Sequence, residues 1–233
     1  MKILILVAYL LCCSKIFAQK NFEGRIIYNM YPAEDSLNKK KMIVYLKENK
    51  IFIEYPVKDF SKPNSLYDFN EGRAYMFVGD SIVTYLKLAR NIFPFAGSER
   101  NSTNMFLKIA GRPCYKRSSI INAPMNNYFD KIENWFTNEI FFKVNDSFNF
   151  IVPPVLFFSG VSISLKTNII LNRNNAPRSN DIIVEAVEIV EENIPASKFE
   201  IGKYKRIISL EAYSKELLEK FKAIDGELKN KNR

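Results

Sequence analysis

Apolar and polar residues alternate one by one along much of this chain, a pattern typical of extended strands with one buried side. The clearest example is 161–172, where the two sides differ completely: Val161, Ile163, Leu165, Ile169 and Leu171 against Ser162, Ser164, Lys166, Asn168 and Asn172. The segment 22–30 alternates in the same way. The chain is therefore predicted to be mainly β.

Short strand-like segments follow one another with turn residues between them. Glu48-Asn49 and Asn70-Glu71-Gly72 predict tight hairpins. No helical pattern interrupts the series, which favours an antiparallel sheet whose dry face is covered by curling, by a second sheet or by a helix. We expect strands at 42–46, 51–55, 66–69, 74–78, 82–88, 106–109, 114–121 and 182–190, extended chain within 128–144 and 148–158, and a short last strand at 199–201.

The C-terminal segment has the periodicity of a helix. Its apolar residues recur at steps of three and four and so share one side: Leu210, Tyr213, Leu217, Phe221, Ile224 and Leu228. Ser209 is the predicted N-cap, and Glu211–Lys215 and Glu216–Lys220 are predicted ion pairs. We expect the apolar stripe to pack on the domain itself; the alternative is pairing with another chain.

The first eighteen residues predict export. Lys2 precedes the apolar run 3–11, and the small residue Ala18 precedes Gln19, as in a secretory signal peptide. Loss of Lys2 and Lys15 lowers the net charge from +9 to +7. We divide the chain into a signal peptide (1–18), an antiparallel β domain (19–206) and a C-terminal helical extension (207–233), and expect a periplasmic, outer-envelope or extracellular location.

The cysteine and histidine content excludes several kinds of site. The sequence has no histidine, which excludes Ser-His-Asp and Cys-His nucleophile systems and imidazole zinc sites. Cys12 and Cys13 lie in the export segment and do not follow a small residue, so lipid attachment there is the less favoured alternative. Cys114 is the remaining thiol; we expect it to be buried, rather than paired with another chain or reactive. No catalytic residue, cofactor or metal is predicted.

Two apolar segments do not follow the alternating pattern of the predicted strands. Phe93 and Phe95 lie in the predicted loop 89–104, and Pro153-Pro154 interrupts the apolar run 148–158, where adjacent prolines exclude a central strand. Phe93 and Phe95 either plug the end of the core or belong to a flap over a cavity. The candidate mouth for a hydrophobic ligand comprises Phe93, Phe95, Val155, Leu156, Phe157 and Phe158.

Four segments, taken in order, carry a family resemblance: 22–28 (FEGRIIY), 110–117 (AGRPCYKR), 135–140 (WFTNEI) and 194–205 (IPASKFEIGKYK). Together they resemble the exported GLPGLI proteins of Bacteroidetes-type bacteria and a sister domain of unknown function. Both groups look like distant relatives of the outer-membrane lipoprotein carriers. The stretch 153–160 (PPVLFFSG) stands in place of the GLPGLI signature. The resemblance covers about 22–206 and implies a curved antiparallel sheet, an open half-barrel, whose concave side holds apolar material; it implies no catalytic residue.

The leading hypothesis is a non-enzymatic envelope protein that binds an acyl chain or lipoprotein on the concave face. The alternative is a structural or protein-interaction module that binds an envelope protein through the C-terminal helix or a sheet edge. An enzyme is disfavoured because the sequence shows neither a pair of carboxylates at a catalytic spacing nor a glycine-rich phosphate-binding loop. The basic patches 39–41 and 203–206 are interpreted as solubilising surface, with anionic lipid as the alternative partner; export disfavours nucleic acid. No segment after 18 is long and apolar enough to span a membrane.

Overall fold

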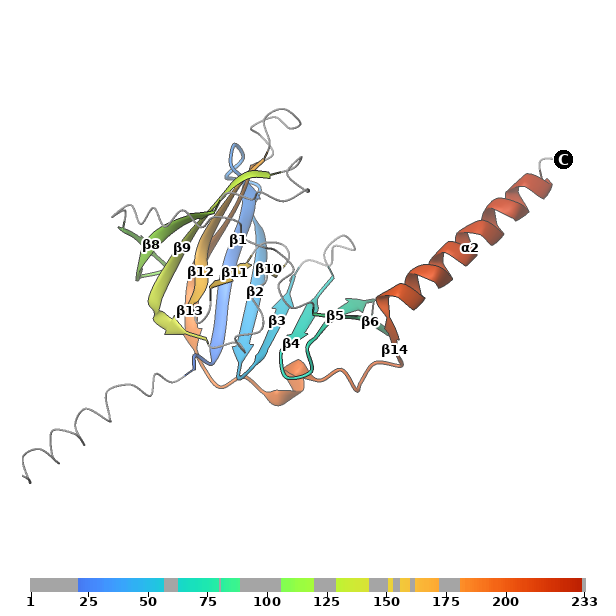
Figure 1. Cartoon of the computed structure of the whole chain (residues 1–233), viewed down its shortest axis with the longest axis horizontal. Coiled ribbons are helices and arrows are strands. Elements are labelled where there is room, and N and C mark those ends of the chain that lie inside the picture. Colours follow the sequence, from blue (N-terminus) through green and yellow to red (C-terminus); the bar gives the residue numbers. More distant parts are fainter. Residues whose placement is uncertain are drawn as a thin grey trace, which may run out of the picture.

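The computed structural model describes residues 21–56, 63–79, 81–88, 106–119, 129–142, 151–152, 156–159, 162–171 and 181–231. The predicted signal peptide, with Cys12 and Cys13, lies outside these residues. Within them the strands join one large sheet (Figure 1).

The strands have the following bounds. The first half of the chain forms β1 (Gly24–Pro32), β2 (Lys40–Lys47), β3 (Lys50–Glu54), β4 (Ser65–Asp68), β5 (Arg73–Val78), β6 (Ile82–Lys87), β7 (Phe106–Ile109) and β8 (Arg112–Ser119). The second half forms β9 (Phe129–Phe141), β10 (Ile151–Val152), β11 (Leu156–Ser159), β12 (Ser162–Leu171), β13 (Ile182–Glu191) and β14 (Arg206–Ser209). A 3-10 helix, η2 (Ala196–Phe199), and the helix α2 (Leu210–Lys231) complete the described elements.

The sheet is antiparallel except at one edge. In the described part of the chain, twelve strands follow the order β14-β6-β5-β4-β3-β2-β1-β13-β12-β9-β8-β7; β11 also pairs with β12, and β10 pairs with β11. β1 lies inside the sheet between β2 and β13. β14 is parallel to β6, with Arg206 beside Ile82 and Ser209 beside Tyr85. The predicted antiparallel β architecture is confirmed.

The half of the sheet from β13 to β7 curls strongly. Although three strands separate them in the sheet order, β7 approaches β13. The backbone N–H of Phe22 donates to the carbonyl of Phe141 over 2.6 Å, which ties the start of β1 to the end of β9. The described edge strands β14 and β7 do not pair with each other, so the sheet stays open. The structure thus confirms a curved, open sheet followed by a C-terminal helix.

Residues with left-handed backbone make the tight turns. Gly72 has φ 63°, and the β7–β8 turn uses Ala110 (φ 46°) and Gly111 (φ 82°). Both predicted hairpins are confirmed, but in the first of them Glu48 takes the positive φ of 52°. Asn49 instead uses its side chain, whose amide donates to Asn70 Oδ1 over 2.9 Å and so joins two neighbouring turns.

The strands β2 to β6 bury apolar side chains on both faces. The concave cluster includes Ile26, Tyr28, Met42, Val44, Leu46, Ile51, Ile53, Ile109, Cys114, Ile163, Leu165 and Val184. The back cluster, on the opposite face, contains Phe52, Leu66, Tyr75, Phe77, Val83, Ile194 and Phe199. Neighbouring residues in one strand, such as Ile51 and Phe52, therefore belong to different clusters.

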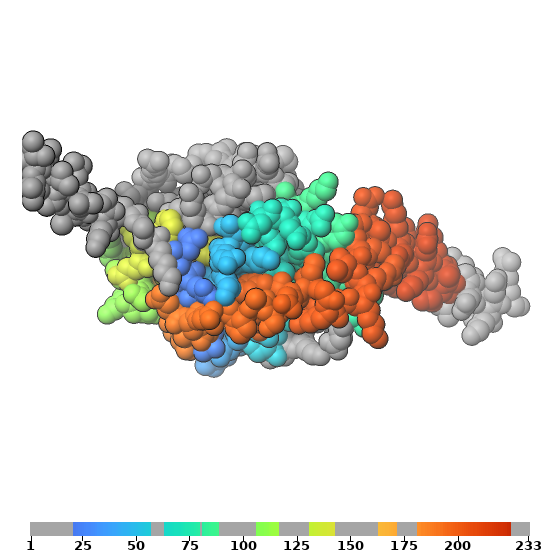
Figure 2. Space-filling model, turned by 90° about the horizontal axis from the view of Figure 1, so that it is seen from below, coloured from blue at the N-terminus to red at the C-terminus, as the bar shows by residue number. Residues whose placement is uncertain are grey.

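The segment 192–205, called the back strap here, covers the back cluster. After β13 it crosses the sheet to the far edge, seen in Figure 2 as an orange band that leads into the red helix. Ile194 and Phe199 of the strap are 2% and 6% exposed, and the ring of Tyr204 lies 4.9 Å from that of Phe77. The prediction of a strand at 199–201 is wrong: Phe199 ends η2 because its ring packs on the sheet instead of extending it.

The helix α2 leaves the edge of the sheet. Ser209 Oγ accepts the N–H of Ala212 over 3.2 Å, and Glu211 pairs with Lys215 over 3.0 Å, which confirms the predicted cap and one predicted ion pair. Glu216 instead accepts hydrogen bonds from both terminal nitrogens of Arg206.

The expectation that the apolar stripe of α2 packs on the domain is wrong. Figure 1 shows α2 pointing away from the sheet. Its apolar side chains are exposed: Leu217, Leu218, Phe221 and Ile224 at 36%, 54%, 66% and 54%. The physical reason is that the strap already covers the back face, and β14 already pairs with the β6 edge.

Replacing Phe199 tests how strongly the strap is held. Phe199→Ala removes a buried ring from the back cluster, and we expect the free energy of unfolding to fall by about 3 kcal/mol. Urea denaturation followed by circular dichroism measures this change. The matched control is Phe106→Ala, whose ring is 74% exposed, with an expected change within about 0.5 kcal/mol. Equal effects of the two substitutions would contradict the packing role of the strap.

Candidate functional site

The concave face is apolar over many neighbouring strands. Each strand directs alternate side chains to this face, and β-branched residues fit the pleat well. Seven of these side chains are 0% exposed: Ile26, Met42, Val44, Ile51, Ile53, Ile163 and Leu165. Because these side chains have no contact with solvent, the concave side is a packed hydrocarbon interior, which suits apolar material and offers little to a polar substrate.

The few polar groups among the concave residues bond to one another or to the backbone. Tyr28 is 0% exposed, and its hydroxyl donates to the carbonyl of Ser164 over 3.0 Å. Burial raises the pKa of Tyr28 far above its usual value, so the phenol stays neutral. Thr167 Oγ1 donates to Asn134 Oδ1 over 2.8 Å, and both residues are buried. These groups are satisfied internally, as buried polar groups must be.

Cys114 belongs to the same interior. It is a free thiol with 0% exposure, which confirms the predicted burial. Its Sγ donates a weak hydrogen bond to the carbonyl of Arg112 at 3.5 Å, and burial raises the pKa of the thiol to about 11. Because the thiolate is the nucleophile, a neutral buried thiol is unsuited to covalent chemistry.

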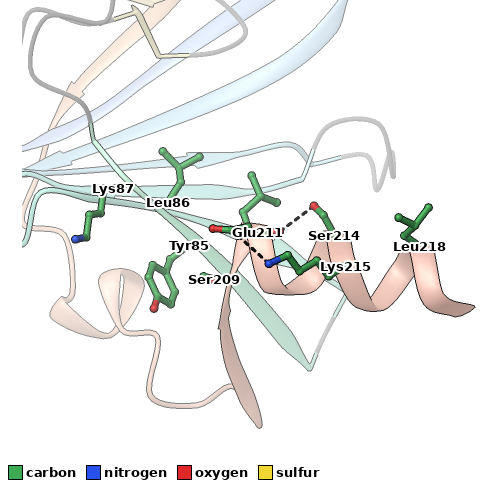
Figure 3. A pocket seen from close by; sticks show the side chains of 9 residues that line it. Tyr85, Leu86, Lys87, Ser209, Glu211, Ser214, Lys215 and Leu218 are labelled. Atoms are coloured by element: carbon green, nitrogen blue, oxygen red, sulfur yellow. Dashed lines mark hydrogen bonds and ion pairs between the residues drawn. The ribbon is translucent and has the colours of Figure 1, made fainter.

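An open groove lies where the β6 edge meets α2, and we call it the rim groove. It has a volume of about 770 Å³ and lies between the end of β6 and the first turns of the helix. Figure 3 shows Leu86 and Leu218 pointing to the same side of this junction. The lining residues are Tyr85, Leu86, Lys87, Ser209, Leu210, Glu211, Ser214, Lys215 and Leu218.

Leu86 joins the rim groove to the concave face. This side chain packs against the concave cluster and also lines the groove. The polar groups of the helix wall are mostly engaged: Ser214 donates to the carbonyl of Leu210 over 2.8 Å, and Lys215 pairs with Glu211. The apolar concave surface therefore continues past the last antiparallel strand to the first turns of α2.

The predicted mouth residues are only partly placed. Phe93, Phe95 and Val155 lie outside the described residues. Leu156, Phe157 and Phe158 form β11, in which Phe157 lies opposite Ile151 and Phe158 opposite Ile163. Their backbone thus extends the sheet beside β12. The mouth formed by these six residues stays a prediction.

Ion pairs and hydrogen bonds hold the first half of the strap on the back face. Glu23 Oε1 binds Lys47 Nζ over 2.9 Å and accepts the N–H of Ile194 over 3.0 Å. Lys198 Nζ lies 2.8 Å from Glu54 and 4.2 Å from the ring centre of Tyr45. Burial opposes ionisation of Glu54, but hydrogen bonds from Lys198 and Tyr45 outweigh it and lower its pKa.

A second hollow, of about 530 Å³, lies beside this strap and includes Arg25 and Lys198 among its lining residues. Its charged groups bind one another: Arg25 lies 3.4 Å from Glu192, and Lys198 holds Glu54. The arrangement fixes the strap to the sheet, and Glu200 and Lys203 also line the hollow.

In the described ranges, no group of three or more cysteine, aspartate or glutamate side chains lies close enough together to hold a metal ion. The helices among the described residues include none that is both long and apolar enough to cross a bilayer.

A scan against protein-family models found no match, and a search of curated proteins found no similar sequence. Among solved structures, the chain is similar to PNGF-II at 17% identity with a TM-score of 0.52, covering 81% of this chain and 31% of that one. The chain thus spans about a third of PNGF-II, and the likeness is one of fold.

Two further solved structures show weaker likeness. They are an uncharacterized conserved protein from Thermus thermophilus (8% identity, TM-score 0.46, 80% and 91% of the two chains) and a LolA superfamily protein from Nitrosomonas europaea (13%, 0.31, 79% and 91%). The resemblance to GLPGLI proteins stays a prediction. The comparisons establish a shared fold for this chain, an open and mostly antiparallel sheet.

Cys114 should resist thiol reagents in the folded protein. Because it is fully buried and its pKa is raised to about 11, we expect labelling by iodoacetamide at pH 8 only after addition of denaturant. Mass spectrometry of the intact protein measures the added mass. Phe106→Cys in a Cys114→Ser background is the exposed control and should react at once. Rapid labelling of native Cys114 would refute its burial.

The strap should loosen in acid through Glu54. Since the pKa of Glu54 is lowered in the folded state, its contribution to stability is fully present above the ordinary value of 4.5 and is lost as pH falls through the lowered pKa. The protection of the amides at 194–204 against hydrogen exchange, measured relative to the intrinsic exchange rate at each pH, should therefore fall in acid in the native protein. In Glu54→Gln the exchange should be faster at neutral pH and depend less on acid; an unchanged pH profile would contradict this role.

Proposed function

We propose that this is a non-enzymatic protein of the cell envelope that holds an apolar ligand, an acyl chain or the lipid tail of a lipoprotein, against the concave side of its sheet. The observation that carries the proposal is the continuity between the apolar concave face and the open rim groove, through Leu86. The predicted export of the chain supports the envelope location.

The rim groove has the chemistry of an entrance for a lipid. Leu86, Leu210 and Leu218 supply apolar walls, and each methylene transferred from water to such a surface contributes about 0.8 kcal/mol. Lys87 stands at the same groove and offers positive charge to an anionic head group, whereas Lys215 is paired with Glu211. An amphiphile would thus lie with its chain toward the concave face and its head group at the edge.

The state of three reactive groups supports a non-enzymatic role. Cys114 is buried and neutral, and the back-face acids Glu23 and Glu54 are bound by lysines that fasten the strap. Catalytic groups need a pKa and an exposure matched to their task. In the part of the chain that the structure describes, these side chains serve stability.

A second candidate function is a protein-interaction module. It is favoured by exposed apolar residues on α2 and also on the edge strand β7, where Phe106 and Leu107 are 74% and 40% exposed. A sheet edge of this kind accepts an added strand. The two candidates differ in the ligand: the first binds lipid as an isolated chain, whereas the second needs a protein partner.

Lipid binding can be tested on the purified protein. We expect mass spectrometry of organic extracts to detect a bound amphiphile, and a fluorescent fatty acid to bind with saturation. Leu218→Asn, at the groove wall, should weaken this binding about tenfold, because it removes apolar surface from the entrance. The matched control is Leu37→Asn, since Leu37 is 94% exposed and does not line the groove. An extract that contains no amphiphile, together with no binding of the fluorescent fatty acid, would refute the proposal.

A further inference from the structure

The helix α2 presents an apolar face that nothing in the described residues covers. Leu217, Leu218, Phe221 and Ile224 are all at least 36% exposed. Ordinary surface helices keep such a face against their own domain. Here the helix continues outward from the sheet (Figure 1), and the described part of this face, from Leu217 to Ile224, is exposed.

The stripe follows a heptad repeat. Leu210, Leu217 and Ile224 fall seven residues apart, and Ser214, Phe221 and Leu228 form the second series, at alternate steps of four and three. This is the a/d pattern of helices that pack side by side. Residues Leu210–Lys231 would extend for roughly 33 Å at 1.5 Å per residue, long enough for about three heptads.

The charge along α2 selects the orientation of a partner helix. Residues 210–219 contain Glu211, Glu216 and Glu219 against Lys215, a net charge of −2. Residues 220–231 contain Lys220, Lys222, Lys229 and Lys231 against Asp225 and Glu227, a net charge of +2. Two copies of α2 in antiparallel orientation would place each acidic half beside a basic half. The net charge of zero over 210–231 also disfavours an anionic membrane, which attracts helices with an excess of lysine and arginine.

We propose that α2 binds α2 of a second copy of this chain as an antiparallel pair. When the two series of apolar positions face each other, Phe221 lies beside Ile224 of the second copy and Leu217 beside its Leu228. The same register brings Lys220 opposite Glu227 of the second copy, twice in a symmetric dimer. The two β domains lie at opposite ends of the helix pair, which avoids a clash between them.

The contact is small and its affinity should be modest. An interface between two helices of this length lies at the low end of specific protein contacts, where complexes are transient. An isolated helix pair of this length is marginal, but here Ser209 caps α2, and the Arg206–Glu216 pair braces its first turns. We expect a dimer in the micromolar range, and this inference does not depend on lipid binding.

Sedimentation velocity of residues 19–233 over micromolar concentrations tests the dimer. We expect a concentration-dependent shift from monomer to dimer. The triple variant Leu217→Gln, Phe221→Gln, Ile224→Gln should stay monomeric, whereas the matched control Phe106→Gln, Leu107→Gln, on the β7 edge, should dimerise like the parent. A parent chain that stays monomeric throughout, or a triple variant that still dimerises, would overturn the proposal.

Charge reversal tests the orientation. Lys220→Glu should weaken dimerisation at least tenfold, and Lys220→Glu with Glu227→Lys should restore it, because each pair is re-formed across the antiparallel interface. Restoration by Lys220→Glu with Asp225→Lys, and not by the first double variant, would indicate a parallel pair and overturn the orientation. A protein that stays monomeric and binds anionic phospholipid vesicles through the stripe would show that a membrane is the partner instead.

Discussion

An apolar concave face that must be kept from water is the constraint on which the rest of this structure depends. Alternation within each strand directs residues such as Ile26, Val44 and Ile163 to that face, and curling of the sheet brings them together. The strands β2 to β6 are apolar on their other face as well, so they need a second cover. After β13 the chain crosses the back face and covers these apolar residues. It thereby reaches the far edge of the sheet, where β14 pairs with β6.

The back strap covers the half of the sheet formed by β2 to β6, and in the other half charged side chains pack around Trp135. In β8, β9, β12 and β13 the cross-strand neighbours Lys116, Trp135, Lys166 and Glu185 form a row. The two lysine Nζ atoms lie 5.1 and 5.8 Å from the centre of the Trp135 ring, and Lys166 pairs with Glu185 over 3.3 Å. The two lysines cover the Trp135 ring, which is 7% exposed, whereas the aromatic back residues Phe52, Tyr75 and Phe77 of β3 and β5 are covered by the strap.

Local patterns made the strands and the helix predictable from sequence, whereas long-range pairings were not. The alternation in 161–172 and the three- and four-residue steps after Ser209 are properties of neighbouring residues, and both elements were found where expected. The strap has no period, because Ile194, Phe199 and Tyr204 reach the sheet from an irregular backbone. The strand β14 is only four residues long and pairs with a strand more than a hundred residues earlier. The rim groove depends on that pairing, so no sequence pattern could indicate it.

The position of α2 links the two surfaces that we propose to be functional. Leu210 and Leu218 line the groove, and Leu217, Phe221 and Ile224 continue along the helix as the stripe, so adjacent residues serve different contacts. The Arg206–Glu216 pair joins β14 to the second turn of α2 and thereby fixes the angle at which the helix leaves the edge. A ligand that enters between β6 and α2 must act on that same junction. Lipid binding and self-association would therefore be coupled through the direction of a single helix, with an effect on each that is reciprocal by thermodynamic necessity.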